Sequence, residues 1–483
     1  MSLSRRDFLA ATVALGAAQL LPSRAHGRGA PPWAVGFEGV TEDLPPRPMV
    51  LSGRFPAACR GSLYRNGPAL YERAGQRYGH WFDPDGMVQA FRIDGAAVEH
   101  RGRFVRTDKF RREDAAGRFL YDGAGSVLSG TGPLRSNESI NTANISVQPW
   151  GGELLALWEA GSPYRVDPQS LETRGRLHWR EELDGVPFSA HPRFDDAGEL
   201  WNIGAVPFAG RPLLVLYHID SDGSLKKWRA QPLDFAGYMH DFVLTPRYLV
   251  ALNSSLLIGA GETFVDSMRW EPARASELLV FDREDFTLVS RAEVPPAFVF
   301  HFGNAWEDGD ALLFTACQYA DAALVKRGMG RLARQEPGPY HDEPELLRYR
   351  LLPQRGSATV ERLGIDMEFP GFDRRYPFRA QALYGVGGQV ASESGLSSAV
   401  QRVDPRSGDL QRYDYGPGVI VEEPLYVPGP EGGYLLHSWL DYGAGRSGLS
   451  VLHAGRLAEG PIATAQMERV LPLGFHGCFL PQV

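Results

Sequence analysis

Cysteines, long apolar runs and an excess of positive charge are all scarce or missing in this chain of 483 residues. The three cysteines, Cys59, Cys317 and Cys478, are too few and too scattered for a disulfide framework or a cysteine-based zinc site. No apolar run reaches the roughly 18 residues that a membrane-spanning helix needs. The 50 Lys and Arg residues are outnumbered by 58 Asp and Glu, which gives a formal net charge of −8. This balance argues against a nucleic-acid partner, because such a partner requires a basic surface.

Long amphipathic helices are scarce as well, whereas residues that form turns abound. The 55 Gly and 36 Pro divide the chain into short elements. Alternating apolar runs predict strands at 87–93, 213–219, 278–281 and 449–453. Short helices are expected near 321–334 and 262–269. These features predict an all-β protein built as a sandwich, a barrel or a propeller, and the length favours a propeller of several blades.

The first residues have the order of an export signal. Arg5 and Arg6 form a twin-arginine pair, residues 10–21 form a short apolar run, and Ser23 and Ala25 supply small residues for a cleavage site. We therefore expect a twin-arginine signal peptide at 1–25, an N-terminal extension at 26–44 and a single domain at 45–483. The expected location of the mature protein is the periplasm.

Four of the twelve histidines stand among apolar or small residues, which predicts burial, and a buried imidazole needs a polar partner. They are His191, His240, His301 and His476. Their separations of 49, 61 and 175 residues exclude a local metal motif. Ligands so far apart in sequence would converge only at a central axis, such as that of a propeller. A purely structural role for each imidazole is the alternative.

An ordered series of motifs accompanies these histidine segments along the chain. The motifs lie at 61–68, 80–87, 141–144, 156–161, 344–349, 368–370, 375–376 and 423–424. Through them the chain resembles the carotenoid cleavage oxygenases, a family that includes apocarotenoid oxygenases, stilbene-cleaving dioxygenases and the vertebrate retinoid isomerase. The resemblance runs from about Pro45 to the C-terminus.

The resemblance implies a seven-bladed β-propeller in which short helices and loops form a dome over a metal site on the axis. The implied metal is a non-haem Fe²⁺, with O2 as co-substrate, and its ligands are His191, His240, His301 and His476. The family also has three glutamates that accept the other ring N–H of the imidazoles, and these fall on Glu159, Glu368 and Glu423. One histidine must then be held differently, and the resemblance suggests His191. Neutral imidazoles also suit Cu, Zn and Ni, so ligand type alone does not select iron.

The implied reaction is insertion of O2 across a C=C bond of a carotenoid or apocarotenoid, which gives two carbonyl products and needs no side-chain nucleophile. Ile145 departs from the family, because many bacterial members have Thr at this place near the open iron position. Stilbene-cleaving members hold a phenol with a Tyr and a Lys. The matching strand at 103–107 has no such Tyr, and residues 118–125 have no obvious Lys.

Two alternatives stay open for the function. The first is an oxygenase of the same family that acts on stilbenoids or phenylpropenes. The second is an exported propeller that binds a polyene without cleaving it. In each case the partner is an apolar polyene or alkene, and contact with a membrane would be peripheral, through an apolar patch for which residues 255–258 are a candidate.

Three further residues receive structural interpretations. His80 and Cys478 are expected to be structural, and Glu307 is expected in a solvated loop.

Overall fold

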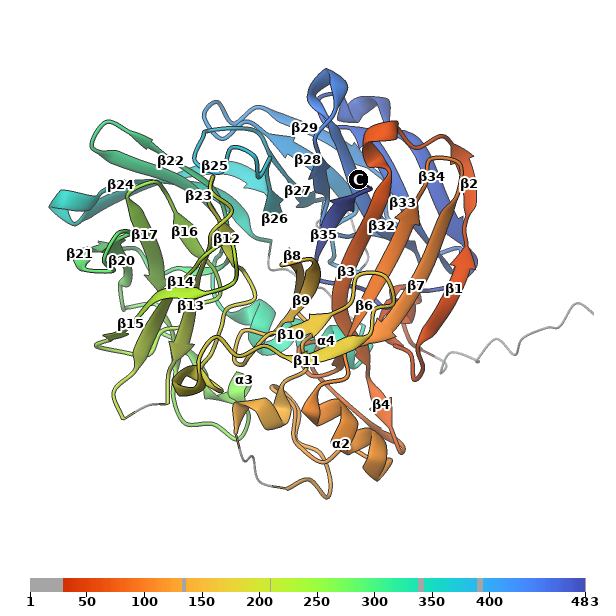
Figure 1. Cartoon of the computed structure of the whole chain (residues 1–483), viewed down its shortest axis with the longest axis horizontal. Coiled ribbons are helices and arrows are strands. Elements are labelled where there is room, and N and C mark those ends of the chain that lie inside the picture. Colours follow the sequence, from red (N-terminus) through yellow and green to blue (C-terminus); the bar gives the residue numbers. More distant parts are fainter. Residues whose placement is uncertain (1–28, 133–135, 209, 338–342, 389–393, 483) are drawn as a thin grey trace, which may run out of the picture.

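Seven sheets of four or more strands stand around one axis in the part of the chain that the structure describes (Figure 1). The computed structural model describes residues 29–132, 136–208, 210–337, 343–388 and 394–482. The predicted seven-bladed propeller is therefore confirmed. The predicted signal peptide, residues 1–25, lies outside the described residues. No described helix is both long enough and apolar enough to span a bilayer.

The seven sheets are numbered here as blades in chain order, each given from its outer to its inner strand. Blade 1 comprises β1 (Leu44–Pro48), β7 (Val98–Phe104), β6 (Asp85–Ile93), β3 (Gly61–Leu70) and β35 (His476–Pro481). Blade 2 comprises β11 (Thr173–Arg176), β10 (Tyr164–Val166), β9 (Glu153–Leu157) and β8 (Ser146–Trp150). Blade 3 comprises β15 (Leu225–Pro232), β14 (Leu213–Ile219), β13 (Leu200–Val206) and β12 (Arg193–Phe194). Blade 4 comprises β21 (Leu288–Val294), β20 (Ser276–Asp282), β17 (Tyr248–Asn253) and β16 (Phe242–Leu244).

The remaining three blades complete the ring. Blade 5 comprises β25 (Ser357–Asp366), β24 (Glu345–Leu352), β23 (Ala311–Tyr319) and β22 (Phe298–Asp308). Blade 6 comprises β29 (Leu410–Asp414), β28 (Ala399–Val403), β27 (Leu383–Gly387) and β26 (Glu368–Gly371). Blade 7 comprises β2 (Val50–Gly53), β34 (Pro461–Met467), β33 (Arg446–His453), β32 (Tyr434–Asp441) and, side by side on β32, β30 (Val419–Val421) and β31 (Leu425–Val427).

Helices and two small hairpins occupy the connections. The α-helices are α2 (Asp108–Ala116), α3 (Phe264–Ser267) and α4 (Met329–Ala333), and a π-helical turn, η5 (Leu324–Gly328), precedes α4. The 3₁₀ turns are η1 (Pro32–Phe37), η2 (Ala57–Cys59), η3 (Asn137–Ile140), η4 (Glu181–Leu183), η6 (Pro353–Arg355), η8 (Pro430–Gly432) and η9 (Leu457–Glu459). The hairpins are β4 (Glu72–Arg73) with β5 (Gln76–Arg77), and β18 (Leu256–Ile258) with β19 (Met268–Trp270). The labelled helices gather at one side of the ring, in the lower part of Figure 1.

Apolar side chains hold neighbouring blades together. One cluster joins Val88 of blade 1 to Ala156 of blade 2, and another joins Val250 of blade 4 to Phe314 of blade 5. All four side chains are fully buried. Because a buried Val or Phe contributes about 1.5–3 kcal/mol, interfaces of this kind give the ring its stability.

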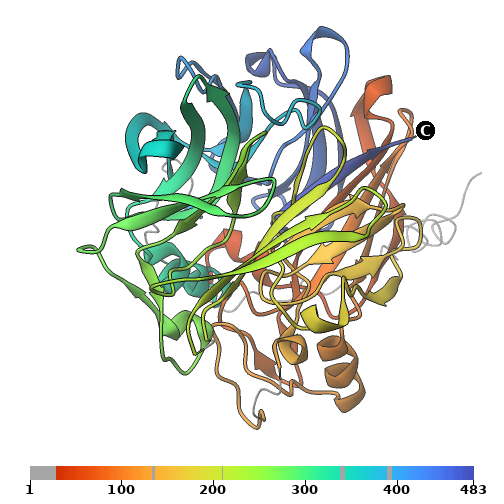
Figure 2. The ribbon, with the colours of Figure 1, turned by 60° about the vertical axis from the view of Figure 1, so that its left-hand side comes forward.

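Both ends of the described chain close the ring. Strand β35, near the C-terminus, pairs with β3, and Gly477 lies opposite Arg65. Strand β2, near the start, pairs with β34 of blade 7. Red N-terminal strands accordingly lie beside blue C-terminal strands in both views (Figures 1 and 2). This double closure fixes the inner strands around the axis.

Most local predictions are confirmed, but that for Glu307 is wrong. All four predicted strands and both predicted helical regions are present. Glu307 belongs to strand β22 and accepts a 2.8 Å hydrogen bond from the Thr245 hydroxyl and another from Arg247. His80 is buried and bonded to the Val325 carbonyl oxygen at 2.8 Å, as its structural interpretation requires.

Candidate metal centre

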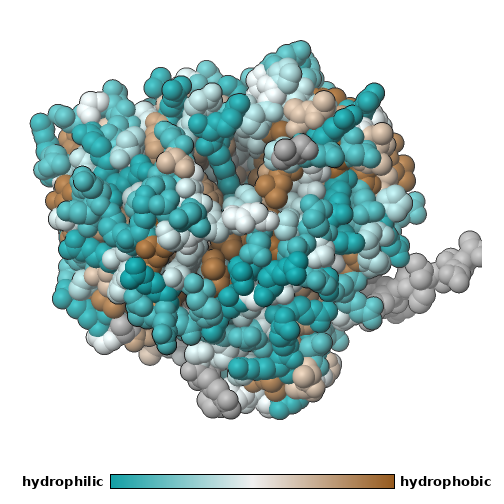
Figure 3. All heavy atoms as spheres, viewed as in Figure 1, coloured by the Kyte–Doolittle hydropathy of each residue, from teal (hydrophilic) through white to brown (hydrophobic). Residues whose placement is uncertain are grey.

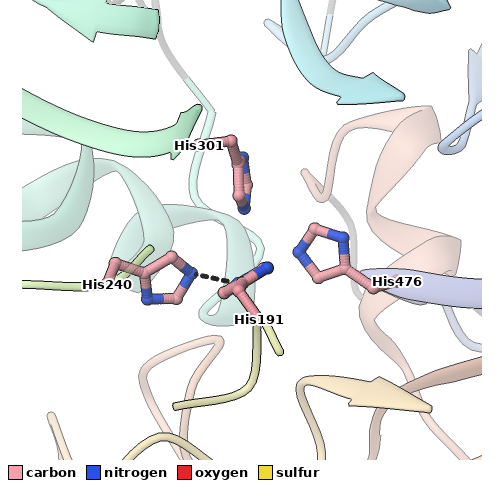
Figure 4. Close-up of side chains that lie close together, drawn as sticks. All are labelled: His191, His240, His301 and His476. Atoms are coloured by element: carbon pink, nitrogen blue, oxygen red, sulfur yellow. Dashed lines mark hydrogen bonds between the residues drawn. The ribbon is translucent and has the colours of Figure 1, made fainter. Parts of the chain in front are cut away.

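Four imidazoles point toward one centre on the propeller axis (Figure 4). They belong to the four histidines singled out in the sequence, and their nearest ring nitrogens all lie within 4.8 Å of one another. The Nε2 atoms of His191 and His240 are 2.9 Å apart. His240, His301 and His476 are buried, whereas His191 is half-buried.

These side chains are positioned by the starts of strands that lie near the axis. His191 and His240 lie two residues before β12 and β16, and His301 and His476 are the fourth residue of β22 and the first of β35. These four are the inner strands of blades 3, 4, 5 and 1. The propeller therefore brings together histidines that are far apart in the sequence.

A carboxylate meets the Nδ1 atom of three of the four imidazoles. Glu159 Oε2 lies 2.5 Å from His240 Nδ1, and Glu423 Oε1 lies 3.0 Å from His476 Nδ1. Glu368 is hydrogen-bonded to His301 Nδ1 in the same way. A carboxylate at Nδ1 favours a proton there and leaves the Nε2 lone pair free to face the centre.

The three glutamates come from the blades that supply no histidine. Glu159 follows β9 of blade 2, Glu368 begins β26 of blade 6, and Glu423 lies between β30 and β31 of blade 7. Each of the seven blades thus contributes one residue to the centre. His191 has no carboxylate partner within the described part of the chain, in line with its predicted difference from the other three.

The electrostatics of the cluster favour neutral imidazoles at two positions, His191 and His476. Burial and the neighbouring imidazoles hold the pKa of His191 well below its usual value. Burial likewise lowers the pKa of His476 to about 4, against the opposing effect of Glu423. Burial also acts to lower the pKa of His301, but the charge of Glu368 outweighs it, so that this pKa is raised. His240, the remaining ligand candidate, lies against Glu159.

This donor set fits a divalent transition metal. Nε2 of His301 is buried and has no hydrogen-bond partner among the described residues, which is a costly arrangement unless something binds it. Neutral imidazole nitrogens are the ligands that Fe, Cu, Zn and Ni share. A metal at the centre would be held by the four Nε2 atoms, with the carboxylates orienting three of the rings.

Two residues that the sequence analysis did not assign support the glutamates. The Tyr238 hydroxyl lies 3.1 Å from both carboxylate oxygens of Glu159. Arg65, which is 1 % exposed, lies 3.2 Å from Glu423 and 3.2 Å from Glu422. Arg65 lies inside the motif at 61–68 and Tyr238 lies two residues before His240, but their partners lie too far away in the sequence to be inferred from it.

An apolar cavity of about 100 Å³ adjoins the imidazoles on the helix side. Ile145 lines it together with His240, His301 and His476. Its other walls include Phe300 and residues of η5 and α4, namely Leu324 and Met329. This cavity offers a water-poor space beside the histidines.

A second, larger cavity of about 520 Å³ also reaches His191, His301 and His476 and extends along the inner strands toward their ends. Leu244 at the end of β16 and Pro481 at the end of β35 line it, and Arg193 and Arg374 make it more polar than the first cavity. Cys478 also lines this space. Burial raises the pKa of its thiol to about 12, so the thiol stays protonated and agrees with a packed structural residue.

We expect Glu368→Gln to weaken metal binding without unfolding the protein. The substitution removes the charge that raises the pKa of His301 and weakens the hold on its ring. Loss of such an outer partner costs about 10–100-fold in metal affinity. Competition between the protein and a chelator for Co²⁺ measures the change.

Glu307→Gln is the matched control for this prediction. Glu307 belongs to the same strand as His301 and also accepts hydrogen bonds, but its partners are Thr245 and Arg247 rather than an imidazole. The control should bind Co²⁺ like the wild type. Equal affinity of both variants would contradict the role of Glu368.

The sequence matches the protein family described as Retinal pigment epithelial membrane protein over residues 37–481. Apocarotenoid-15,15'-oxygenase of Synechocystis sp. is 29% identical over 486 residues, which cover 92% of this chain and 95% of that protein. Isoeugenol monooxygenase of Pseudomonas putida is 28% identical over 460 residues, which cover 89% and 94%. The solved structure of a cobalt-substituted Synechocystis apocarotenoid oxygenase matches with a TM-score of 0.81 at 26% identity and covers 93% of this chain and 98% of that one.

Proposed function

We propose that this chain, which belongs to the Retinal pigment epithelial membrane protein family of carotenoid cleavage oxygenases, is an Fe²⁺-dependent oxygenase. It would cleave a C=C bond of an apolar alkene. Its products would be two carbonyl compounds, and O2 would be the co-substrate. The observation that carries this proposal is the convergence of four imidazoles, three of them bonded to carboxylates, beside an apolar cavity.

Positioning and exclusion of water are the tasks of the protein in this reaction. Bound Fe²⁺ would supply the binding site and the electrons for O2. The four histidines add no negative charge, so the metal keeps its full positive charge, and four ligands leave room for others. The apolar walls around Ile145 and Phe300 exclude water and hold the double bond near the centre. No side-chain nucleophile is required.

A carotenoid or apocarotenoid is the first candidate substrate. Two observations support it: the family itself and the 29% identity to an apocarotenoid-15,15'-oxygenase. The aromatic and aliphatic lining of the smaller cavity suits a polyene, which offers only apolar surface along its chain.

A shorter alkene, such as a phenylpropene, is the second candidate. The cavity of about 100 Å³ beside the imidazoles is small against the roughly 300–1,000 Å³ of a typical ligand pocket. An isoeugenol monooxygenase is among the relatives, at 28% identity. Ile145 is larger and more apolar than the Thr that many bacterial members of the family have at this place. It narrows the space next to the metal position.

The test is aerobic incubation of the mature chain, loaded with Fe²⁺, with an apocarotenal and separately with isoeugenol. Mass analysis of the products would identify the cleaved bond. Two carbonyl fragments from the apocarotenal would support the first substrate, and turnover of isoeugenol alone would support the second. Tight pigment binding with no O2 consumption and no product would overturn the enzyme proposal in favour of a carrier.

We also propose that the protein is exported to the periplasm and that its contact with membranes is peripheral. Replacing Arg5 and Arg6 with Lys should retain the protein in the cytoplasm, because the twin-arginine route reads this pair. Cell fractionation measures the outcome, and unchanged periplasmic protein would contradict it.

The surface bears on the second part of that proposal. The face in Figure 3 is mostly hydrophilic, with hydrophobic residues in small scattered groups. In the candidate patch at 255–258, Ser255 and Leu256 are fully buried, and only Leu257 and Ile258 reach the surface in part. Flotation with lipid vesicles would test for binding.

A further inference from the structure

Within residues that the structure describes, His191 lacks the kind of carboxylate partner that orients each of the other three imidazoles, and its own strand offers little support. Strand β12 begins two residues later and is only two residues long, pairing Arg193 with Trp201 and Phe194 with Leu200. The His191 amide nitrogen donates to the Ser189 hydroxyl at 3.2 Å. Something else must fix this histidine relative to its neighbours if the four rings are to share one ion.

A buried ion pair lies directly beside three of the histidines. Arg193, two residues after His191, donates from Nη2 to Oδ2 of Asp241 at 2.5 Å. Asp241 immediately follows His240, and its side chain is only 2 % exposed. The pair therefore joins the histidine strand of blade 3 to that of blade 4.

The same pair also binds the residue after His301. Asp241 Oδ2 accepts a hydrogen bond from the Phe302 backbone N–H at 2.8 Å, and Arg193 Nη2 donates to the Phe302 carbonyl oxygen at 3.0 Å. The pairing of β22 with β23 shifts register on both sides of Phe302. Regular sheet pairing is thus interrupted here, and the ion pair is hydrogen-bonded to both the backbone N–H and the carbonyl oxygen of Phe302.

We propose that Arg193 and Asp241 are positioning residues that set the spacing of His191, His240 and His301 around the metal, in the place of the carboxylate that His191 lacks. This inference rests on the proposed metal centre. The guanidinium of Arg193 bonds to two acceptors from two different blades, and a fixed planar donor is suited to such a role.

The test measures metal release rather than turnover. Wild-type protein and Arg193→Met are loaded with Co²⁺, and its transfer to an excess of chelator is followed with time. We expect release from Arg193→Met to be about 10–100-fold faster, the usual effect of losing support behind a metal ligand. The visible absorption bands of Co²⁺ should also change, because they report ligand number and geometry.

Arg283→Met is the matched control. Arg283 pairs with Asp195, and this pair also joins blade 4 to blade 3. Its burial resembles that of the first pair, with side chains 16 % and 5 % exposed against 19 % and 2 %. Because none of the described hydrogen bonds of Arg283 or Asp195 reaches a neighbour of a histidine ligand, this variant should keep the wild-type spectrum and release rate.

Two further variants keep the test decisive if Arg193→Met does not fold. Asp241→Asn preserves the side-chain shape and should also speed release of Co²⁺. Arg193→Lys keeps the charge but loses the planar donor, so its release rate should lie between those of the wild type and Arg193→Met. Wild-type release rates in Arg193→Met and Asp241→Asn, or equal acceleration in Arg283→Met, would overturn the positioning role while the metal centre stands. Failure of the wild type to bind about one Co²⁺ per chain would overturn the metal centre, and the positioning role with it.

Discussion

Replacing His301 with Ala should remove both the metal and the activity while the propeller stays folded. In the part of the chain that the structure describes, the Nε2 atom of His301 is buried without a hydrogen-bond partner, and its Nδ1 atom is fixed by Glu368. Loss of a direct ligand should exceed the roughly 10–100-fold effect of losing an outer partner. Elemental analysis after purification and the alkene cleavage assay measure the two effects.

His218→Ala is the control for this experiment. His218 is also bonded to a glutamate, with Nε2 2.6 Å from Glu199, but it stacks on Trp201 in the middle of blade 3 and is not part of the axial cluster. This variant should keep its metal. Retention of a full metal load by His301→Ala would refute the assignment of the centre.

The four histidines and the three glutamates of the centre could be predicted from the sequence, but the pairing of each glutamate with its histidine could not. Each histidine stands among apolar residues in a segment that matches the family, so its burial follows from local features and its role as a ligand from the family resemblance. The carboxylate partners are separated from them by 81, 67 and 53 residues. Which carboxylate meets which imidazole depends on the packing of blades, and only the family resemblance indicated the three glutamates.

The Arg193–Asp241 pair shows the same limit more sharply. Both residues lie within two positions of a predicted ligand, yet nothing local shows that they bond to each other and to Phe302. Their contact depends on how three inner strands approach the axis. Interactions between blades are therefore the part of the site that required the structure.

Helix α2 was missed although its sequence contains the signals for it. The Thr107 side chain accepts a hydrogen bond from the Phe110 amide and caps the helix start, and Gly117, at a φ of 64°, ends it. Most of its residues are polar, so the segment shows no clear apolar periodicity. One buried residue explains its position, because Lys109 bonds to both Asp85 and Glu113 at 2.9 Å.

Replacing Arg65 with Met should strongly destabilise the propeller. Arg65 lies on β3, opposite Gly477 of the closing strand β35, and its guanidinium lies 3.2 Å from each of two carboxylates, Glu422 and Glu423. Removing it leaves both acidic groups without their cation. Breaking a buried ion pair in this way costs about 3–5 kcal/mol.

Urea unfolding of the metal-free protein measures this loss separately from any loss of metal binding. Arg348→Met is the control, since Arg348 pairs with Glu361, which is 58 % exposed, and such surface pairs contribute about 0–1 kcal/mol. Adding Glu422→Gln to Arg65→Met should restore part of the stability, because it removes one of the two unpaired charges.

An unfolding midpoint for Arg65→Met equal to that of Arg348→Met would show that closure of the ring depends on strand pairing alone. The expected difference instead links closure to the centre, because Arg65 holds Glu423, and Glu423 in turn orients His476 on the strand that closes the ring.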